Sequence, residues 1–214
     1  MTEPAVIATA NPRVRWAQPG DAAAVADRIA AELAKPGPRR LAMTGGSTPL
    51  KVFALLKTRG LDWHGTTLAL TDDRRVPDDH PASNFGKLFA ALGDSGASFE
   101  RLEEGASVAP FDLVWLGMGE DGHVASLFPT MQALVRPGAT VIATTPVPLP
   151  PEAPFDRLTL TARALKATRE IILVVTGAAK KALIEDVLSG NADYPVSEFL
   201  RGADGPPVTI YWSE

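Results

Sequence analysis

Short apolar runs alternate with longer segments of helical periodicity along most of the chain. The runs have the length of strands, and several consist almost entirely of aliphatic residues, which is typical of strands buried on both faces of a sheet. Residues 1–12 have the character of a frayed start or an edge strand. Further strands are expected at 41–43, 67–70, 111–116, 139–145, 171–175 and 208–212.

The intervening segments carry apolar residues at helical spacing. Val25, Ile29 and Leu33 recur every four positions after Asp21, which is a favourable residue for a helix N-cap. Residues 124–128 are expected to form a short helix that Pro129 closes. Other helices are expected to begin near 48, 84, 162, 178 and 196.

The alternation of strands and helices predicts an α/β fold with three α/β/α layers around a mostly parallel, Rossmann-like sheet. No repeat or long linker divides the sequence, so we expect a single domain over residues 1–214. Residues 71–77 are expected to form a charged loop. The proline-rich segment 146–154 is expected to be an extended crossing within the same domain.

Composition removes several classes of function. The 214 residues are 45% hydrophobic, which is an ordinary globular composition. Their net charge of -4 lacks the excess of basic residues that is typical of nucleic-acid-binding proteins. The absence of cysteine excludes disulfides and thiolate chemistry, and the presence of only three histidines argues against a multi-histidine metal site. No apolar run approaches the roughly 20 residues that span a bilayer. We expect a cytoplasmic protein without membrane partners; a monomer is compatible with the sequence, which does not set the oligomeric state.

The strand at 111–116 runs directly into the sequence GMGEDGHVASLFP at 117–129. Ligands of open α/β sheets bind at the carboxyl ends of strands, and Asp121 and His123 at that place are candidates for acid–base chemistry. The first six of these residues also fit the dinucleotide pattern G-x-G-x-x-G. That pattern requires an acidic residue after the next strand, which here ends at Pro146, so a nicotinamide or flavin site is the less favoured alternative. A structural turn, with Asp121 as a helix cap, is a further alternative.

A second candidate site follows the strand at 41–43, where TGGSTP occupies 44–49. Free backbone N–H groups at a helix start, next to Gly45 and Gly46, favour an anion, and the hydroxyls of Ser47 and Thr48 can add hydrogen bonds. A plain capped helix is the alternative. The Gly-Lys pair of a Walker loop is missing.

Charged residues follow other strands. The segment at 72–75 can form a solvated turn or orient sugar hydroxyls. Arg157 and Lys180 occur later, each near the start of an ordered segment. If both converge on one helix N-terminus, they form a phosphate site; the sequence alone does not show whether they do.

Taken in order, these segments resemble the 6-phosphogluconolactonase family. The block at 117–129 resembles the family signature and is the most specific match. One departure is visible, since Asp73 stands where the family usually has Glu, a change that keeps the charge and shortens the reach. The resemblance extends from Leu41 to Lys180. The other matching segments are 44–49, 72–77 with 83–84, 157–161 and 177–180.

The resemblance implies a three-layer fold shared with glucosamine-6-phosphate deaminases. It implies hydrolysis of 6-phospho-D-glucono-1,5-lactone to 6-phosphogluconate in the oxidative pentose phosphate pathway, without metal or cofactor. In the deaminases the Asp-Gly-His segment continues with Ala-Phe-Asn-Glu-Pro. Here residues 125–129 read ASLFP, and the missing Glu favours lactone hydrolysis. A non-catalytic sugar-phosphate-binding regulator is a third hypothesis, although it would not need His123.

The resemblance also implies roles for individual residues. His123 is expected to be the general base, because imidazole titrates near neutral pH. Asp121 is expected to orient the imidazole, although residues two positions apart need not touch, and Arg74 to stabilise the oxyanion or hold sugar oxygens. The residues expected to bind the phosphorylated sugar are Gly45, Gly46, Ser47, Thr48, Asp72, Asn84, Arg157 and Lys180.

Overall fold

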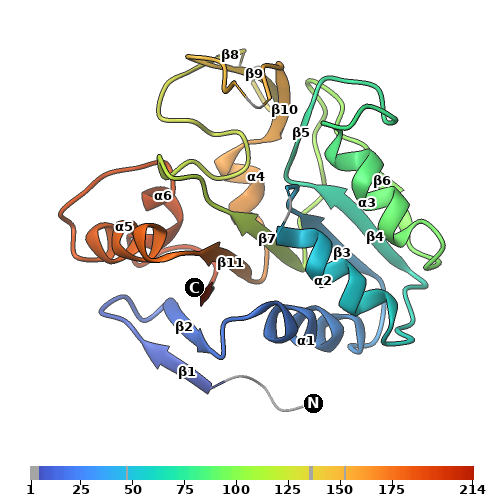
Figure 1. Ribbon diagram of the computed structural model, residues 1–214, viewed down its shortest axis with the longest axis horizontal. Coiled ribbons are helices and arrows are strands. Elements are labelled where there is room, and N and C mark those ends of the chain that lie inside the picture. Colours follow the sequence, from blue (N-terminus) through green and yellow to red (C-terminus); the bar gives the residue numbers. More distant parts are fainter. Residues whose placement is uncertain (1–4, 47, 135–136, 152) are drawn as a thin grey trace.

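The computed structural model describes residues 5–46, 48–134, 137–151 and 153–214. Figure 1 shows two sheets with helices around the larger one. The larger sheet has eight strands in the order β1-β2-β12-β11-β7-β3-β4-β6, and the smaller has four in the order β5-β10-β9-β8. No helix in the described ranges has the length and apolar character that a membrane span needs.

Every pair of strands in the larger sheet is parallel except β1 and β2. This confirms the prediction of a mostly parallel sheet. The edge strand expected near the N-terminus is β1, at the end of the strand order. The strand β2 was not expected, because its arginine and glutamine interrupt the apolar pattern. The strands of this sheet are β1 (Ala5–Ala8), β2 (Val14–Gln18), β3 (Arg39–Met43), β4 (Thr66–Leu70), β6 (Ser98–Glu100), β7 (Leu113–Gly117), β11 (Ile171–Thr176) and β12 (Val208–Ser213).

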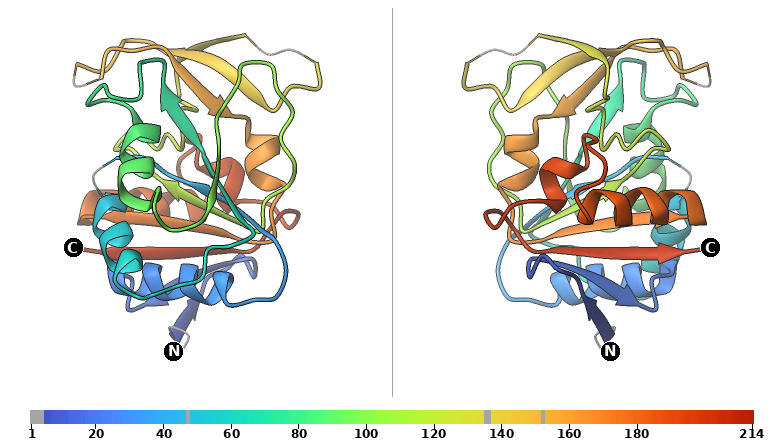
Figure 2. Two further views of the ribbon diagram at one scale, coloured as in Figure 1. Left: turned by 90° about the vertical axis from the view of Figure 1, so that its right-hand side faces the viewer. Right: turned by 90° about the vertical axis from the view of Figure 1, so that its left-hand side faces the viewer.

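Helices cover both faces of the larger sheet, which confirms the three layers (Figures 1 and 2). One face packs against the first three helices and the other against the last three. Asp21 caps α1 as expected, because its carboxylate accepts a hydrogen bond from the N–H of Ala24 at 2.9 Å. The helices are α1 (Ala22–Leu33), α2 (Thr48–Lys57), α3 (Asn84–Leu92), α4 (Ala162–Lys166), α5 (Ala178–Leu188) and α6 (Ser197–Leu200).

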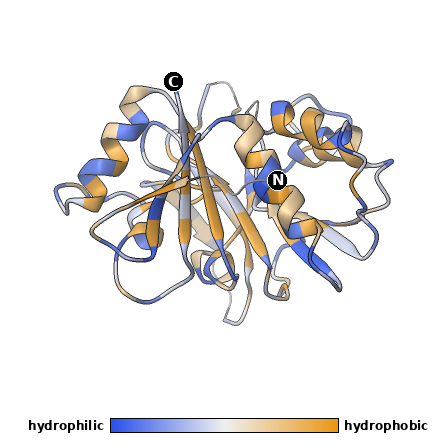
Figure 3. Ribbon diagram, turned by 90° about the horizontal axis from the view of Figure 1, so that it is seen from below, coloured by the Kyte–Doolittle hydropathy of each residue, from blue (hydrophilic) through white to orange (hydrophobic). Residues whose placement is uncertain are grey.

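The central strands consist largely of hydrophobic residues, as Figure 3 shows. In β7, Leu113 and Trp115 pack towards α1–α3, whereas Val114 and Leu116 pack towards α4–α6. Burial of each such side chain stabilises the fold by about 1.5–3 kcal/mol. The strand ends that carry the polar segments are therefore held in fixed positions.

The smaller sheet was not expected from the sequence. It is antiparallel throughout and consists of β5 (Asp72–Arg74), β8 (Met131–Leu134), β9 (Val141–Pro146) and β10 (Arg157–Leu160). The prediction of a charged loop at 71–77 was thus wrong in part, since residues 72–74 form the strand β5. This strand is only three residues long and charged, so it lacks the apolar alternation by which a strand is predicted. In Figure 2 this sheet lies above the three layers, at the top of both views.

The short helix expected at 124–128 is also absent, although all of these residues are described. Val124 instead forms isolated bridges with Met118 and Leu127. Ala125 has φ of 50°, which a right-handed helix does not allow. The N–H of Ser126 donates to Thr159 Oγ1 at 3.2 Å rather than to a helical carbonyl. Asp121 therefore caps no helix.

Candidate active site

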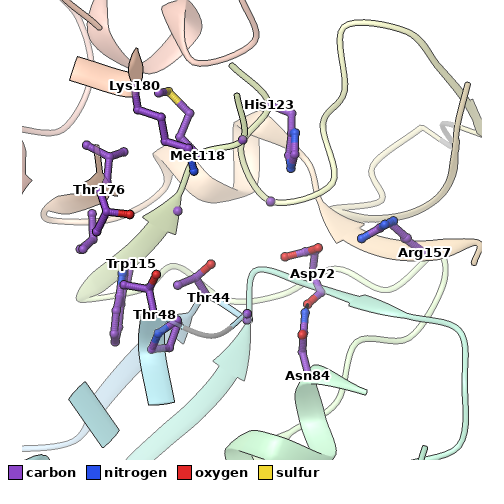
Figure 4. A pocket seen from close by; sticks show the side chains of 18 of the residues that line it. Thr44, Thr48, Asp72, Asn84, Trp115, Met118, His123, Arg157, Thr176 and Lys180 are labelled. Carbon is purple, nitrogen blue, oxygen red and sulfur yellow. Dashed lines mark hydrogen bonds between the residues drawn. The ribbon is translucent and has the colours of Figure 1, made fainter. Parts of the chain in front are cut away.

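A pocket of about 250 Å³ lies at the carboxyl ends of β3, β7 and β11, and β5 and β10 of the smaller sheet form part of its wall. Figure 4 shows side chains from both sheets directed into it. Ser47 lies outside the described residues, and Asp121 contacts a pocket residue without lining the pocket itself. The other expected site residues line it together: Gly45, Gly46, Thr48, Asp72, Arg74, Asn84, His123, Arg157 and Lys180.

His123 and Asp121 form a close pair. The distance from His123 Nδ1 to Asp121 Oδ1 is 2.5 Å, and the same oxygen accepts the backbone N–H of His123 at 3.2 Å. A carboxylate accepts the hydrogen bond of a ring N–H, and in the neutral imidazole a proton on Nδ1 leaves the lone pair of Nε2 free. The pair thus presents an oriented base to the pocket.

Gly119 leaves the room that this pair needs. A Cβ at this position would lie 2.2 Å from His123 Nδ1 and 2.7 Å from Asp121 Oδ1. Its N–H also donates to the carbonyl of His123 at 2.9 Å. No helix follows within 118–130, all of which are described, so the turn does not form the helix N-terminus that binds a pyrophosphate. Gly119 therefore makes room for the histidine, and the segment lacks the helix that a dinucleotide site requires.

Phe128 was missed by the sequence reasoning. Its ring centroid lies 4.3 Å from that of His123, and the guanidinium carbon of Arg157 lies 5.3 Å from its centre. The Phe128 ring thus packs against the imidazole and lies within cation–π distance of the guanidinium. The only sequence signal was its place within the block at 117–129.

Asn84 links the side chain of Arg74 to the backbone of Asp72. Its Oδ1 accepts a hydrogen bond from Arg74 Nη1, and its Nδ2 donates to the backbone carbonyl of Asp72 at 3.2 Å. Arg74 Nη1 also donates to the carbonyl of Ala82 at 3.1 Å. Since Asn84 is the first residue of α3, the start of this helix sets the geometry of one wall of the pocket.

Asp73, the residue that departs from the family pattern, does not line this pocket. Its carboxylate accepts hydrogen bonds from the backbone N–H groups of Arg74, Asn84 and Phe85 at 2.7, 2.7 and 2.9 Å. Burial raises the pKa of Asp73, and the three donors oppose that effect. The residue therefore anchors the N-terminus of α3, and a shorter acid suffices for that contact.

Replacing Asp73 with alanine is expected to lower the melting temperature by about 4–8 °C, because buried N–H groups at the start of α3 lose their acceptor, at a cost of about 2 kcal/mol. Thermal unfolding followed by circular dichroism measures this change. Asp79→Ala is the matched control, because Asp79 is an exposed acid of the same segment. Equal melting temperatures for the two variants would refute the anchoring role.

Three cations line the pocket without an ion pair. Among the described residues, no carboxylate lies within 4.0 Å of the charged nitrogens of Arg74, Arg157 or Lys180. Arg157 is only 5% exposed, and burial, together with the nearby Arg74, lowers its pKa. Its Nη2 donates to the carbonyl of Ala153 at 3.2 Å, but no carboxylate of the described residues forms an ion pair with it, so this buried charge favours an anionic ligand. Arg157 and Lys180 lie on opposite sides of the pocket rather than at one point (Figure 4).

A parallel sheet whose strand ends hold an oriented base and unpaired cations defines an α/β enzyme site for a small anion. The chain matches the family described as glucosamine-6-phosphate isomerases/6-phosphogluconolactonase over residues 20–101 and 96–209. The chain belongs to this family.

Its relatives include several 6-phosphogluconolactonases. The chain is 34% identical to that of Pseudomonas aeruginosa, with 90% of this chain and 89% of the relative covered. It is 37% identical to that of Caulobacter vibrioides, with 85% and 86% covered. The crystal structure of a 6-phosphogluconolactonase from Shewanella baltica matches with a TM-score of 0.76 and 32% identity, over 90% of this chain and 93% of that one.

Proposed function

We propose that this protein hydrolyses 6-phospho-D-glucono-1,5-lactone to 6-phosphogluconate, a step of the oxidative pentose phosphate pathway. The observation that carries the proposal is the oriented base His123 in a pocket lined by the unpaired cations Arg74, Arg157 and Lys180. The substrate supplies both a carbonyl for attack and a phosphate dianion. The names of the relatives point to the same substrate.

Nε2 of His123 accepts a proton from water, and the water oxygen attacks the lactone carbonyl carbon. Negative charge develops on the carbonyl oxygen, and we assign its stabilisation to the guanidinium of Arg74, which lines the pocket. Asp121 stabilises the imidazolium that forms, through the hydrogen bond to Nδ1. The intermediate then collapses, the bond from carbon to ring oxygen breaks, and His123 returns the proton to that oxygen as the C5 hydroxyl. No covalent enzyme intermediate forms.

The remaining pocket residues bind the substrate. We assign the phosphate to Lys180, Arg157 and the backbone at the start of α2, where Gly45, Gly46 and Thr48 lie. Because the two cations lie on opposite sides of the pocket, we assign them to different oxygens of the phosphate. Asp72 and Asn84 are assigned to the sugar hydroxyls.

The test compares two substrates of the family. The protein is incubated with the lactone, followed by acid release, and with glucosamine 6-phosphate, followed by ammonia release. Lactone hydrolysis without ammonia is expected, because residues 125–129 lack the glutamate of the deaminases. Ammonia release without lactone hydrolysis would overturn the proposal in favour of the deaminase reaction.

Replacing Gly46 with valine is expected to weaken 6-phosphogluconate binding by at least about 10-fold, through loss of the backbone geometry at the start of α2. Gly46 has φ of 102°, and apart from its chain neighbours a Cβ there would meet no atom of the described residues within 4 Å, so the change acts on backbone conformation and ligand approach. Gly37→Val is the matched control, since Gly37 has φ of 89° and equally open space, outside the pocket. Calorimetric titration measures the affinities, and equal affinity in both variants would refute the phosphate cradle.

A further inference from the structure

A buried group of hydroxyls lies behind the pocket, and Ser126 is at its centre. This side chain is fully buried, and its Oγ donates a hydrogen bond to Asp72 Oδ2 at 2.6 Å. Asp72 itself is 6% exposed and lines the pocket. The mechanism above uses Asp72 but leaves Ser126 without a role.

The carboxylate of Asp72 is held from two sides. Thr71 Oγ1, also fully buried, donates to Oδ1 at 3.2 Å, while Ser126 donates to Oδ2. A carboxylate offers about four lone-pair sites, so one site on each oxygen remains for other donors. Since Asp72 lines the pocket, those sites are available to sugar hydroxyls.

Ser126 is in turn fixed by its own neighbours. Its N–H donates to Thr159 Oγ1 at 3.2 Å, and its carbonyl accepts from Thr144 Oγ1 at 3.4 Å. The preceding residue, Ala125, has φ of 50°, an unusual conformation for a residue with a side chain, and it lines the pocket. The non-helical turn after His123 therefore directs one buried hydroxyl at Asp72.

We propose that Ser126 is a positioning residue, which fixes the Asp72 carboxylate so that it binds the sugar hydroxyls of the substrate. Ser126 follows His123 by three residues, so a single turn supplies the base and orients the acid on β5. The inference rests on the proposed function, because it takes the ligand to be a polyhydroxylated sugar.

The test is a double-mutant cycle on 6-phosphogluconate affinity and lactonase kinetics. Ser126→Ala is expected to weaken binding by about 3- to 10-fold, the effect of one hydrogen bond, and to raise KM with little change in kcat. In an Asp72→Ala background the same change is expected to have no further effect on affinity, because the group that Ser126 orients is gone.

A matched control separates positioning from general stability. Thr140→Val removes a buried hydroxyl next to β9 whose hydrogen bonds go to Val108 and Ala106 rather than to Ser126 or Asp72, and it is expected to leave affinity unchanged even where the melting temperature falls. Equal losses from Ser126→Ala with and without Asp72, or wild-type affinity of Ser126→Ala, would overturn the inference. Failure of the proposed function is distinguishable, since the unaltered protein would then neither hydrolyse the lactone nor bind 6-phosphogluconate.

Discussion

Replacing His123 with alanine is expected to lower kcat for lactone hydrolysis by about 10²–10⁴-fold, the usual contribution of a general base. The affinity for 6-phosphogluconate is expected to stay within about threefold of the unaltered protein, because His123 acts on water rather than on the phosphate. Steady-state kinetics and calorimetric titration of the same preparation measure the two quantities. Retention of the fold is checked by the melting temperature.

His64→Ala provides the matched control for the histidine variant. His64 is exposed and does not line the pocket, so its removal is expected to leave kcat unchanged. Were His123→Ala to hydrolyse the lactone within about threefold of the unaltered protein, the base would have to be another group.

Replacement of Arg157 or Lys180 with alanine is expected to weaken 6-phosphogluconate binding by about 10- to 100-fold, since hydrogen bonds to charged groups contribute about 1.5–3 kcal/mol. Binding of unphosphorylated gluconate is expected to weaken less. The larger effect is expected for Arg157, because it is the more deeply buried of the two cations. Titration calorimetry with both ligands measures the difference.

Lys181→Ala is the control for these charge changes. Lys181 follows Lys180 in α5, but its Nζ lies 4.4 Å from the ring centre of Trp212, outside the pocket. It is expected to leave both affinities unchanged. Equal losses for phosphorylated and unphosphorylated ligand in the Arg157 and Lys180 variants would mean that these residues do not bind the phosphate.

Much of the fold could be predicted because most of its strands and helices have a hydrophobic pattern that is visible over a short stretch of sequence. The aliphatic runs of β7 and β11 and the periodic helix after Asp21 are stabilised by burial, which the hydrophobic pattern records directly. The smaller sheet could not be predicted in the same way. The strand β5 is charged, and its pairing with β10 joins residues more than 80 positions apart.

In the turn after β7, the local sequence pattern gave a wrong prediction. Residues 124–128 have helical spacing of apolar side chains, yet tertiary hydrogen bonds of Ser126 to Thr159 and Asp72 replace those of a helix. A propensity of a few tenths of a kcal/mol per residue does not outweigh such buried bonds.

Within the site, the rule that ligands lie at the carboxyl ends of strands pointed to His123 and Gly45 separately, and the family resemblance grouped them with Asp72. In the structure all three line one pocket. The contact between His123 and Asp121 could not be deduced, since it depends on the turn that Gly119 permits. The separation of Arg157 and Lys180 across the pocket is likewise a property of tertiary structure.

Decay of the lactone itself is the most direct test of the proposed activity. The lactone is generated in situ, and its disappearance is followed in buffer alone, with the unaltered protein and with His123→Ala. The predicted result is a decay rate that rises in proportion to the concentration of the unaltered protein and returns close to the spontaneous rate with the variant. Decay at the spontaneous rate with the folded, unaltered protein would contradict the assignment of lactone hydrolysis to this pocket.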